Sequence, residues 1–195
     1  GGKYLAYEAG QKVPFMIRWD NDNGALGEKG TERDNSAVLV DLFPTLLDLC
    51  DITVDGSDNN LPTDRVIDGV SMTDLLKNDS VLHTKEHPIL HMKREKLKAI
   101  QYAVPVSDVT SQYPEYDYDV LKNNDYVTFK YFEKIQNDNS AFWDKNRKNW
   151  LHILNDDVGE NYNRATVYPE IADMYKERMH EVADDFKNNR RGIIE

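Results

Sequence analysis

The chain is poor in several features, and each shortage excludes a class of protein. It has one cysteine among 195 residues, which excludes an internal disulfide and a cysteine-rich zinc site. No apolar run approaches the roughly 20 residues that a membrane-spanning helix needs. Its 24 basic residues face 35 acidic ones, and the formal net charge of −11 argues against a general nucleic-acid-binding protein.

The composition that remains is that of a soluble globular protein. Hydrophobic residues make up 39% of the chain and charged residues 30%, so the sequence can form a core and is unlike disordered or fibrous chains. A chain of this length can bury roughly 70% of its unfolded surface. We therefore expect one domain, or one small domain together with part of a second.

The first 50 residues predict a strand and a helix. The short apolar run "VPFMIRW" at residues 13–19 predicts a buried strand. Asp41 is placed to cap a helix over residues 42–50, with Pro44 in the first turn, where its missing N–H costs nothing. Cys50 closes this apolar segment, which indicates a packed thiol and not a nucleophile.

The next segments predict turns and a second, short helix. "DNDNG" at residues 20–24 is interpreted as a turn, because it does not match the ligand spacing of a calcium-binding loop. Residues 51–66 are typical of a loop. Ser71 offers an N-cap for a short helix over residues 72–77.

The character of the sequence changes at about residue 80. Apolar alternation at residues 97–106, 126–135 and 149–154 predicts strands with one buried face, most simply paired antiparallel. A long helix follows from Pro169, with an apolar stripe at helical spacing: Ile171, Met174, Tyr175, Met179, Val182, Ala183 and Phe186.

These elements predict an α/β fold class in two parts. Residues 1–80 form the incomplete tail of an α/β layer. Residues 81–195 form a small antiparallel sheet packed by the long C-terminal helix.

Few residues suggest chemistry by themselves. Lys3 follows two glycines, so it can stand on a tight turn and contact a tetrahedral anion, although spacing alone favours a solvated loop lysine. His83, His87 and His91 are spaced by four, but Pro88 interrupts any helix there, so we expect no metal site. The sequence contains neither a Gly-x-Ser-x-Gly elbow nor a P-loop.

Four segments in order resemble one family over nearly the whole chain. They are "GGKYLAYEAGQKVPFMIRW" (1–19), "VDLFPTLLDLCDI" (40–52), "IDGVSMTDLL" (67–76) and "WLHILNDDVGENYNRA" (150–165). This ordered set resembles the C-terminal part of a type I sulfatase, of the arylsulfatase family within the alkaline phosphatase superfamily. The resemblance implies that the α/β layer is the tail of an alkaline-phosphatase-like catalytic domain.

The resemblance also implies a role for Lys3. In sulfatases the lysine before the Tyr-Glu pair contacts the sulfate of the substrate, and such a contact stabilises charge on the transferring group. Ala9 stands where the family usually has glycine, and Lys12 where it usually has arginine. His91, Lys93 and Arg94 are further candidates for substrate contact, since the C-terminal subdomain commonly closes one side of the cleft; a solvated strand end is the alternative.

The family's reactive groups have no counterpart in the sequence. Its nucleophile is a formylglycine made from cysteine or serine in a Cys/Ser-x-Pro/Ala-x-Arg motif, whereas Cys50 is followed by Asp51, Ile52 and Thr53. Its calcium ligands precede the lysine. We therefore expect calcium and formylglycine in the full-length enzyme, and neither a catalytic residue nor a cofactor or metal site in this part, which should be inactive alone.

Two other functions stay open at this point. One is a non-catalytic module that binds an anionic glycan or acts as a scaffold; the other is a phosphonate or phosphodiester hydrolase of the same superfamily. The partners expected are a sulfated small molecule or glycan and the missing N-terminal domain, with no nucleic acid and no membrane span. Without the parent sheet, the first strand should leave an exposed apolar surface or cause self-association. The family resemblance is compatible with a periplasmic, secreted or lysosomal location.

Overall fold

A computed structural model describes six stretches of the chain: residues 6–20, 23–52, 67–93, 96–116, 118–133 and 149–188. Contacts between residues group the chain into two compact units. The first, which we call the sheet unit, contains Gly1–Val13 and Pro88–Glu195, and the second, the helical unit, contains Pro14–His87. The domain boundary expected between residues 80 and 81 stays a prediction.

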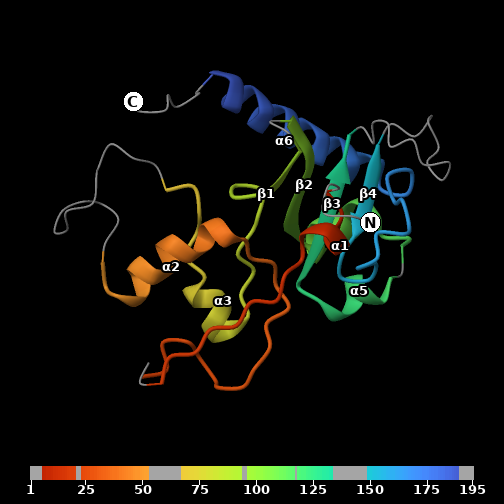
Figure 1. The fold of residues 1–195 in the computed structure, drawn as a ribbon. Coiled ribbons are helices and arrows are strands. Elements are labelled where there is room, and N and C mark those ends of the chain that lie inside the picture. The colour runs from red at the N-terminus through yellow and green to blue at the C-terminus, as the bar shows by residue number, and fades with distance from the viewer. Residues whose placement is uncertain are drawn as a thin grey trace. The chain divides into compact units, whose positions relative to one another are not determined.

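The sheet unit is built on a four-stranded antiparallel sheet with the strand order β1-β2-β3-β4 (Figure 1). Each strand pairs with the next along the chain, which confirms the expected antiparallel sheet. The three predicted strands form, and a fourth precedes them. Their bounds are β1 Ile89–Lys93, β2 Lys96–Pro105, β3 Tyr126–Phe132 and β4 Trp150–Ile153.

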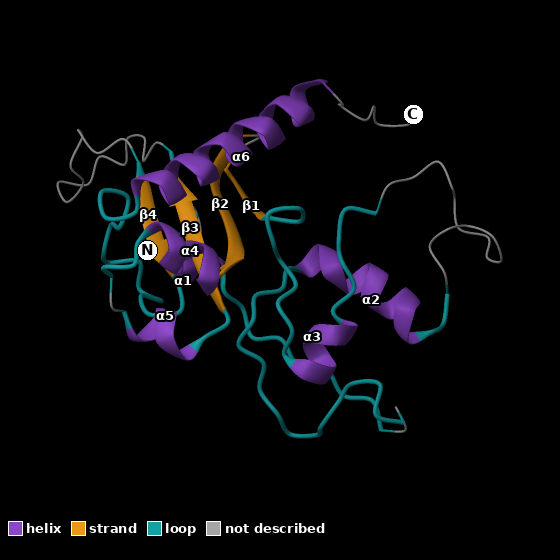
Figure 2. Cartoon of the chain, turned by 180° about the vertical axis from the view of Figure 1, so that it is seen from behind, coloured by secondary structure: helices purple, strands orange, loops and turns teal. Residues whose placement is uncertain are grey.

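The long helix α6, Pro169–Asn188, packs against one face of this sheet (Figure 2). Tyr175 stacks on Tyr102 of β2 with ring centroids 3.8 Å apart, and its hydroxyl donates to the Tyr102 carbonyl at 2.6 Å. The expected stripe is confirmed over the first half of the helix, where Ile171, Tyr175 and Met179 are buried. Towards the C-terminal end, Phe186 is exposed, because the helix extends past the core.

Three short helices of the sheet unit were not expected from the sequence. They are α1 Glu8–Gln11, α4 Val106–Gln112 and α5 Asp119–Asn123. The last two contribute buried valine and leucine side chains to the core that α6 covers, together with a cluster of tyrosine rings around the fully buried Tyr168. Helices of four to seven residues carry too few turns for an apolar period to identify them.

The helical unit contains the two helices expected from the sequence. The 3₁₀ helix η1, Leu39–Asp41, leads into α2, Leu42–Leu49, and α3 follows at Thr73–Asn78. Pro44 lies in the first turn of α2, as expected. The prediction that the Asp41 side chain caps α2 is wrong: its carboxylate accepts from the Val38 amide at 2.8 Å and from more distant groups described below.

Two expectations about apolar residues are also wrong. Residues 13–19 form no strand, and Met16 is 91% exposed, because no strand among the described residues pairs with this segment. The exposed apolar surface expected there is confirmed, with Val13, Phe15 and Trp19 also exposed. Cys50 is exposed and not packed, and it lies at the C-cap of α2, just after the last turn.

None of the helices that the structure describes combines the length and apolar character of a membrane span.

Candidate functional site

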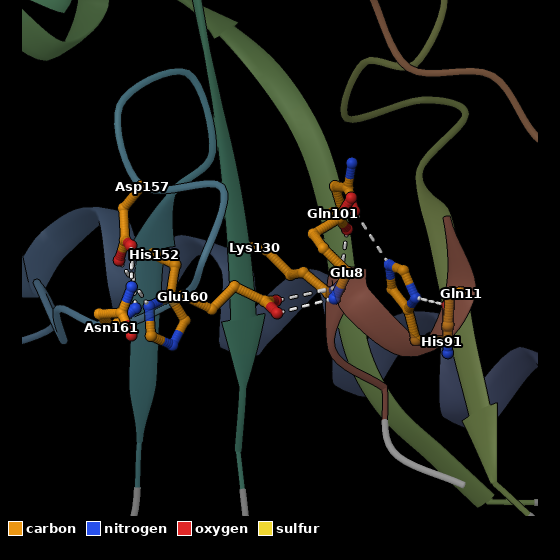
Figure 3. A network of polar contacts seen from close by, with 9 residues as sticks. All are labelled: Glu8, Gln11, His91, Gln101, Lys130, His152, Asp157, Glu160 and Asn161. Carbon is orange, nitrogen blue, oxygen red and sulfur yellow. Dashed lines mark hydrogen bonds and ion pairs between the residues drawn. The ribbon is translucent and has the colours of Figure 1, made fainter. Parts of the chain in front are cut away.

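A row of polar side chains crosses the sheet on the face opposite α6. Gln101 of β2 lies directly opposite Lys130 of β3, and Lys130 lies directly opposite His152 of β4 (Figure 3). Successive side chains of a strand point to opposite faces, so these three share one face. Phe132 and Trp150 lie on that face too and are nearly buried. The polar row is therefore an interior layer and not a solvated surface.

Lys130 is the centre of this layer. Its side chain has no exposed area, and its ammonium group lies 2.9 Å from Glu8 and 3.1 Å from Glu160. The second oxygen of Glu160 accepts the backbone N–H of Glu8 at 2.7 Å. Burial raises the pKa of Glu160, although the neighbouring Lys130 charge opposes this shift. One lysine thus joins a carboxylate near the N-terminus to a carboxylate near the C-terminus.

Helix α1 lies against this layer and is held at both ends. Glu8, its first residue, is bound by Lys130 and Glu160, and Gln11, its last residue, is hydrogen-bonded to the His91 ring. The Tyr7 ring, just before the helix, packs on Phe132 with centroids 5.1 Å apart. The segment that follows Lys3 in sequence is therefore fastened to the sheet.

His91 lies inside this layer. It is 4% exposed, and its Nε2 pairs with the Gln101 side chain at 3.0 Å while its Nδ1 pairs with Gln11. Burial lowers the pKa of His91 to about 3, helped by the charge of Lys130 and opposed by the hydrogen bond to Gln101. The ring is neutral near pH 7, so only one nitrogen donates to a glutamine oxygen, and the other accepts only if the second glutamine turns its amide NH₂ group towards the ring.

The loop after β4 presents Glu160 to Lys130. Asp157 accepts the amides of Asn161 at 2.9 Å and Tyr162 at 2.8 Å, which closes the loop on itself. Burial would raise the pKa of Asp157, but these amides outweigh burial and hold its pKa below the ordinary value. His152 is fully buried with its Nδ1 3.5 Å from Asp157, and burial lowers its pKa.

The helical unit has a separate polar centre at Asp41. This fully buried carboxylate pairs with His83 at 2.9 Å and accepts the Val70 amide at 3.0 Å. Burial would raise its pKa, but the bonds from His83, Val70 and Val38 outweigh burial and lower it. The Asp41 carbonyl also accepts the Thr45 hydroxyl, which in turn accepts the Met72 amide at 2.8 Å.

The four sequence motifs therefore meet in two pairs. The first motif contributes Glu8 and the fourth contributes Glu160, and these two residues meet at Lys130. The second and third motifs meet in the helical unit, where Ser71 and Thr73 donate to Asp48 at 2.6 and 2.7 Å. Both pairs hold together segments that lie far apart in the sequence, through contacts made within one unit.

The predicted substrate-contacting residues are only partly described. Lys3 and Arg94 lie outside the described residues, as does the side chain of Lys93, whose backbone ends β1. The structure brings His91 together with Gln11 and Gln101. Substrate contact by His91, Lys3, Lys93 and Arg94 stays a prediction.

Sequence reasoning missed Lys130, Glu8 and Glu160 as a group. Lys130 occupies the polar side of an alternating strand, the position at which a lysine normally meets solvent. The available signal was Phe132, two residues later on the same face, together with its partner Trp150. Two large aromatic residues on a face indicate that the face is covered.

No three histidine, cysteine, aspartate or glutamate side chains of the described residues are arranged to hold a metal ion.

Comparison with known proteins finds relatives among the steryl-sulfatases. The steryl-sulfatase of Rattus norvegicus is 33% identical over 102 residues, which is 52% of this chain and 16% of that protein. That of Mus musculus is 33% identical over 103 residues, 52% of this chain and 14% of that protein. No family profile matches the chain. The chain thus has a sulfatase-related region, which confirms the resemblance of its motifs to that family, and the match spans about one sixth of these curated relatives.

Proposed function

Proceeding from a chain of which about half is related to the sulfatases, we propose that it is the C-terminal part of a type I sulfatase, which hydrolyses sulfate esters when whole. The observation that carries this proposal is the relationship to two steryl-sulfatases at 33% identity. The motif order supports it, as does the antiparallel sheet with its C-terminal helix.

In this proposal Lys3 contacts the sulfate group. A lysine ammonium is a compact point charge with three donors, which suits an oxyanion whose charge grows during transfer. Glu8 and Gln11 support the assignment, because they fasten the segment after Lys3 to the sheet. Lys93, the last residue of β1, and Arg94, the next residue in the sequence, are proposed to touch the substrate, while the burial of His91 favours a supporting role for its ring.

The reactive groups of the family are assigned to the rest of the enzyme. Formylglycine would supply the nucleophile and calcium would balance the sulfate charge. The residues described here do not fit a calcium site, because no three potential ligands gather among them. The chain contributes anion binding and the C-terminal subdomain, and by itself it should not turn over sulfate esters.

The exposed apolar side chains support a missing catalytic domain as partner. Val13, Phe15 and Met16 are exposed in a segment that resembles a buried strand of the family, and Phe43 and Leu46 are exposed on α2. Contiguous exposed apolar residues mark surfaces that another surface covers. We propose that the alkaline-phosphatase-like α/β domain covers them, and that the chain alone self-associates through them.

The test compares the 195-residue chain with the longer protein that this proposal implies, of which the chain is the C-terminal part. Both are assayed with 4-nitrophenyl sulfate and 4-nitrophenyl phosphate. We expect the longer protein to hydrolyse the sulfate ester faster, and its Lys3→Ala variant to lose at least about 100-fold in kcat/KM. Turnover of sulfate by the short chain alone would contradict the proposal, and a preference for phosphate would favour a phosphohydrolase. Calorimetric binding of sulfated sugars by the short chain would favour a glycan-binding module.

A further inference from the structure

The charged side chain of Lys130 is buried at a position where an apolar side chain would also allow the sheet to fold. The side chain has no exposed area and is bound by two carboxylates. Removing charges from water costs several kcal/mol per ion, and replacing a buried ion pair by apolar side chains is often neutral or stabilising. Phe132 and Trp150 already provide apolar packing on this face of the sheet. A buried lysine here is better explained by what it holds in place.

What Lys130 holds is the start of helix α1. Glu8 is bound twice, by its carboxylate to Lys130 at 2.9 Å and by its amide to Glu160 at 2.7 Å. A four-residue helix has no stability of its own, so its position depends on these contacts and on the bond of Gln11 to His91. Lys130 pairs with both carboxylates, and it therefore sets where α1 begins.

We infer that Lys130 is a positioning residue for the N-terminal anion-binding segment, acting through Glu8 and Glu160. This inference rests on the proposed function, in which Lys3, five residues before Glu8, contacts the sulfate group. Lys130 does not touch the substrate. It holds the start of α1, which follows Lys3 in the sequence, against the sheet. Positioning of this kind matters because a displacement of about 1 Å at a reacting group can cost 100-fold in rate.

The first test measures the position of α1 directly and requires no activity. Amide hydrogen exchange of the 195-residue chain reports the Glu8 N–H, which donates to Glu160. In Lys130→Met, we expect exchange at residues 8–12 to become at least about ten-fold faster while β3 and β4 keep their protection. Tyr175→Phe is the matched control, because it removes one buried hydrogen bond on the opposite face of the sheet. It should leave residues 8–12 unchanged.

The second test uses the longer protein that the proposed function implies, with inorganic sulfate as the probe. Lys130→Met should raise KM for 4-nitrophenyl sulfate and the inhibition constant of sulfate by about ten-fold each. Tyr175→Phe should alter neither constant, even if it lowers Tm as much as Lys130→Met does. Glu8→Gln, which keeps the side-chain length but removes the charge facing Lys130, should reproduce the effect of Lys130→Met and serves if that variant does not fold.

The outcomes separate this inference from the proposed function. Faster exchange at residues 8–12 in a protein without sulfatase activity would support the positioning role and overturn the proposed function. Unchanged exchange and unchanged sulfate inhibition in an active enzyme would overturn the positioning role and leave the proposed function intact. Equal effects of Lys130→Met and Tyr175→Phe on sulfate inhibition would show a general structural effect and would also overturn the inference.

Discussion

The two units of this chain are stabilised in different ways. The sheet unit encloses an extended apolar core between the sheet and α6, and its buried charges lie on the other face of the sheet. The helical unit buries few apolar side chains among its described residues, chiefly Leu47, Met72, Leu75 and Leu76. It relies on polar contacts around Asp41 and on close backbone packing. A unit with so small a core has a low free energy of unfolding. A substitution of a given cost should therefore unfold a larger fraction of the helical unit than of the sheet unit.

The largest expected effect is that of Gly69→Ala in the helical unit. A Cβ at Gly69 would lie 2.1 Å from the Val40 carbonyl oxygen and 2.9 Å from the Asp41 Cα, and backbone atoms cannot move aside easily. We expect the free energy of unfolding of this unit to fall by about 3 kcal/mol or more. Urea denaturation followed by amide exchange measures the loss unit by unit.

Gly30→Ala is the control for this prediction. Gly30 also has a special backbone, with φ of +75°, but an added Cβ would meet nothing within 4 Å. We expect Gly30→Ala to lower the free energy of unfolding by about 1 kcal/mol, because alanine disfavours the left-handed conformation. A loss at Gly69 no larger than at Gly30 would show that the two segments are not in contact.

The next effect concerns pH and tests the buried layer of the sheet unit. The pKa of His91 is about 3 in the folded chain and near 6.5 in the unfolded chain, so the unfolded chain takes up the proton first as pH falls. Stability is therefore fully present above about pH 6.5 and is lost progressively below it, by about 3 kcal/mol at about pH 4. In His91→Gln, this part of the loss should disappear from denaturation curves measured across the range. His152, whose pKa is also lowered, accounts for part of what remains.

His180→Gln is the control for the pH experiment. His180 lies on α6, with half of its side chain exposed, and pairs with Glu133 at 2.6 Å. Its replacement should leave the acid loss of stability close to that of the original chain. If the free energy of unfolding had the same pH dependence in His91→Gln and His180→Gln, the assignment of His91 as a buried residue with a lowered pKa would be wrong.

A smaller effect is expected for Thr45→Val in the helical unit. The Thr45 hydroxyl accepts the Met72 amide at 2.8 Å, and valine would leave that buried amide without its partner. We expect a loss of about 1–3 kcal/mol in the free energy of unfolding. Thr110→Val in α4 removes only a hydroxyl that donates to carbonyls of its own helix, so it is the matched control. A loss at Thr110 equal to that at Thr45 would contradict the dependence of the helical unit on this contact.

The smallest effect on stability is expected for Met16→Ser. Met16 is 91% exposed, so its replacement should change the free energy of unfolding by no more than about 0.5 kcal/mol. Sedimentation should show weaker self-association, because an exposed apolar residue is removed. A large loss of stability would mean that the segment packs within this chain.

The sequence predicted the elements whose patterns are long and local. Strands β2 to β4 follow from apolar alternation, and α6 follows from a period of 3.6 residues. The segment at residues 13–19 has the composition of a strand, but a strand forms only with a partner, and none of the described residues provides one. Apolar composition alone could not reveal that absence.

The polar centres were missed for a different reason. Asp41 has the type and position of a helix cap, yet it binds His83, 42 residues later in the chain. Lys130 has the pattern of a solvent-facing residue, yet it binds Glu8, 122 residues earlier. Contacts at such separations depend on the tertiary fold. Phe132 could indicate that the face of Lys130 is covered, but nothing in the local sequence identifies Glu8 or His83 as the partners.

The most direct test of the account is a double-mutant cycle between Lys130 and Glu8, whose side chains lie 2.9 Å apart. The free energy of unfolding is measured for the original chain, Lys130→Met, Glu8→Gln and the double variant. If Lys130 fastens the N-terminal segment to the sheet, the two changes couple by about 1–3 kcal/mol. Additive effects, with a coupling below about 0.3 kcal/mol, would contradict the account.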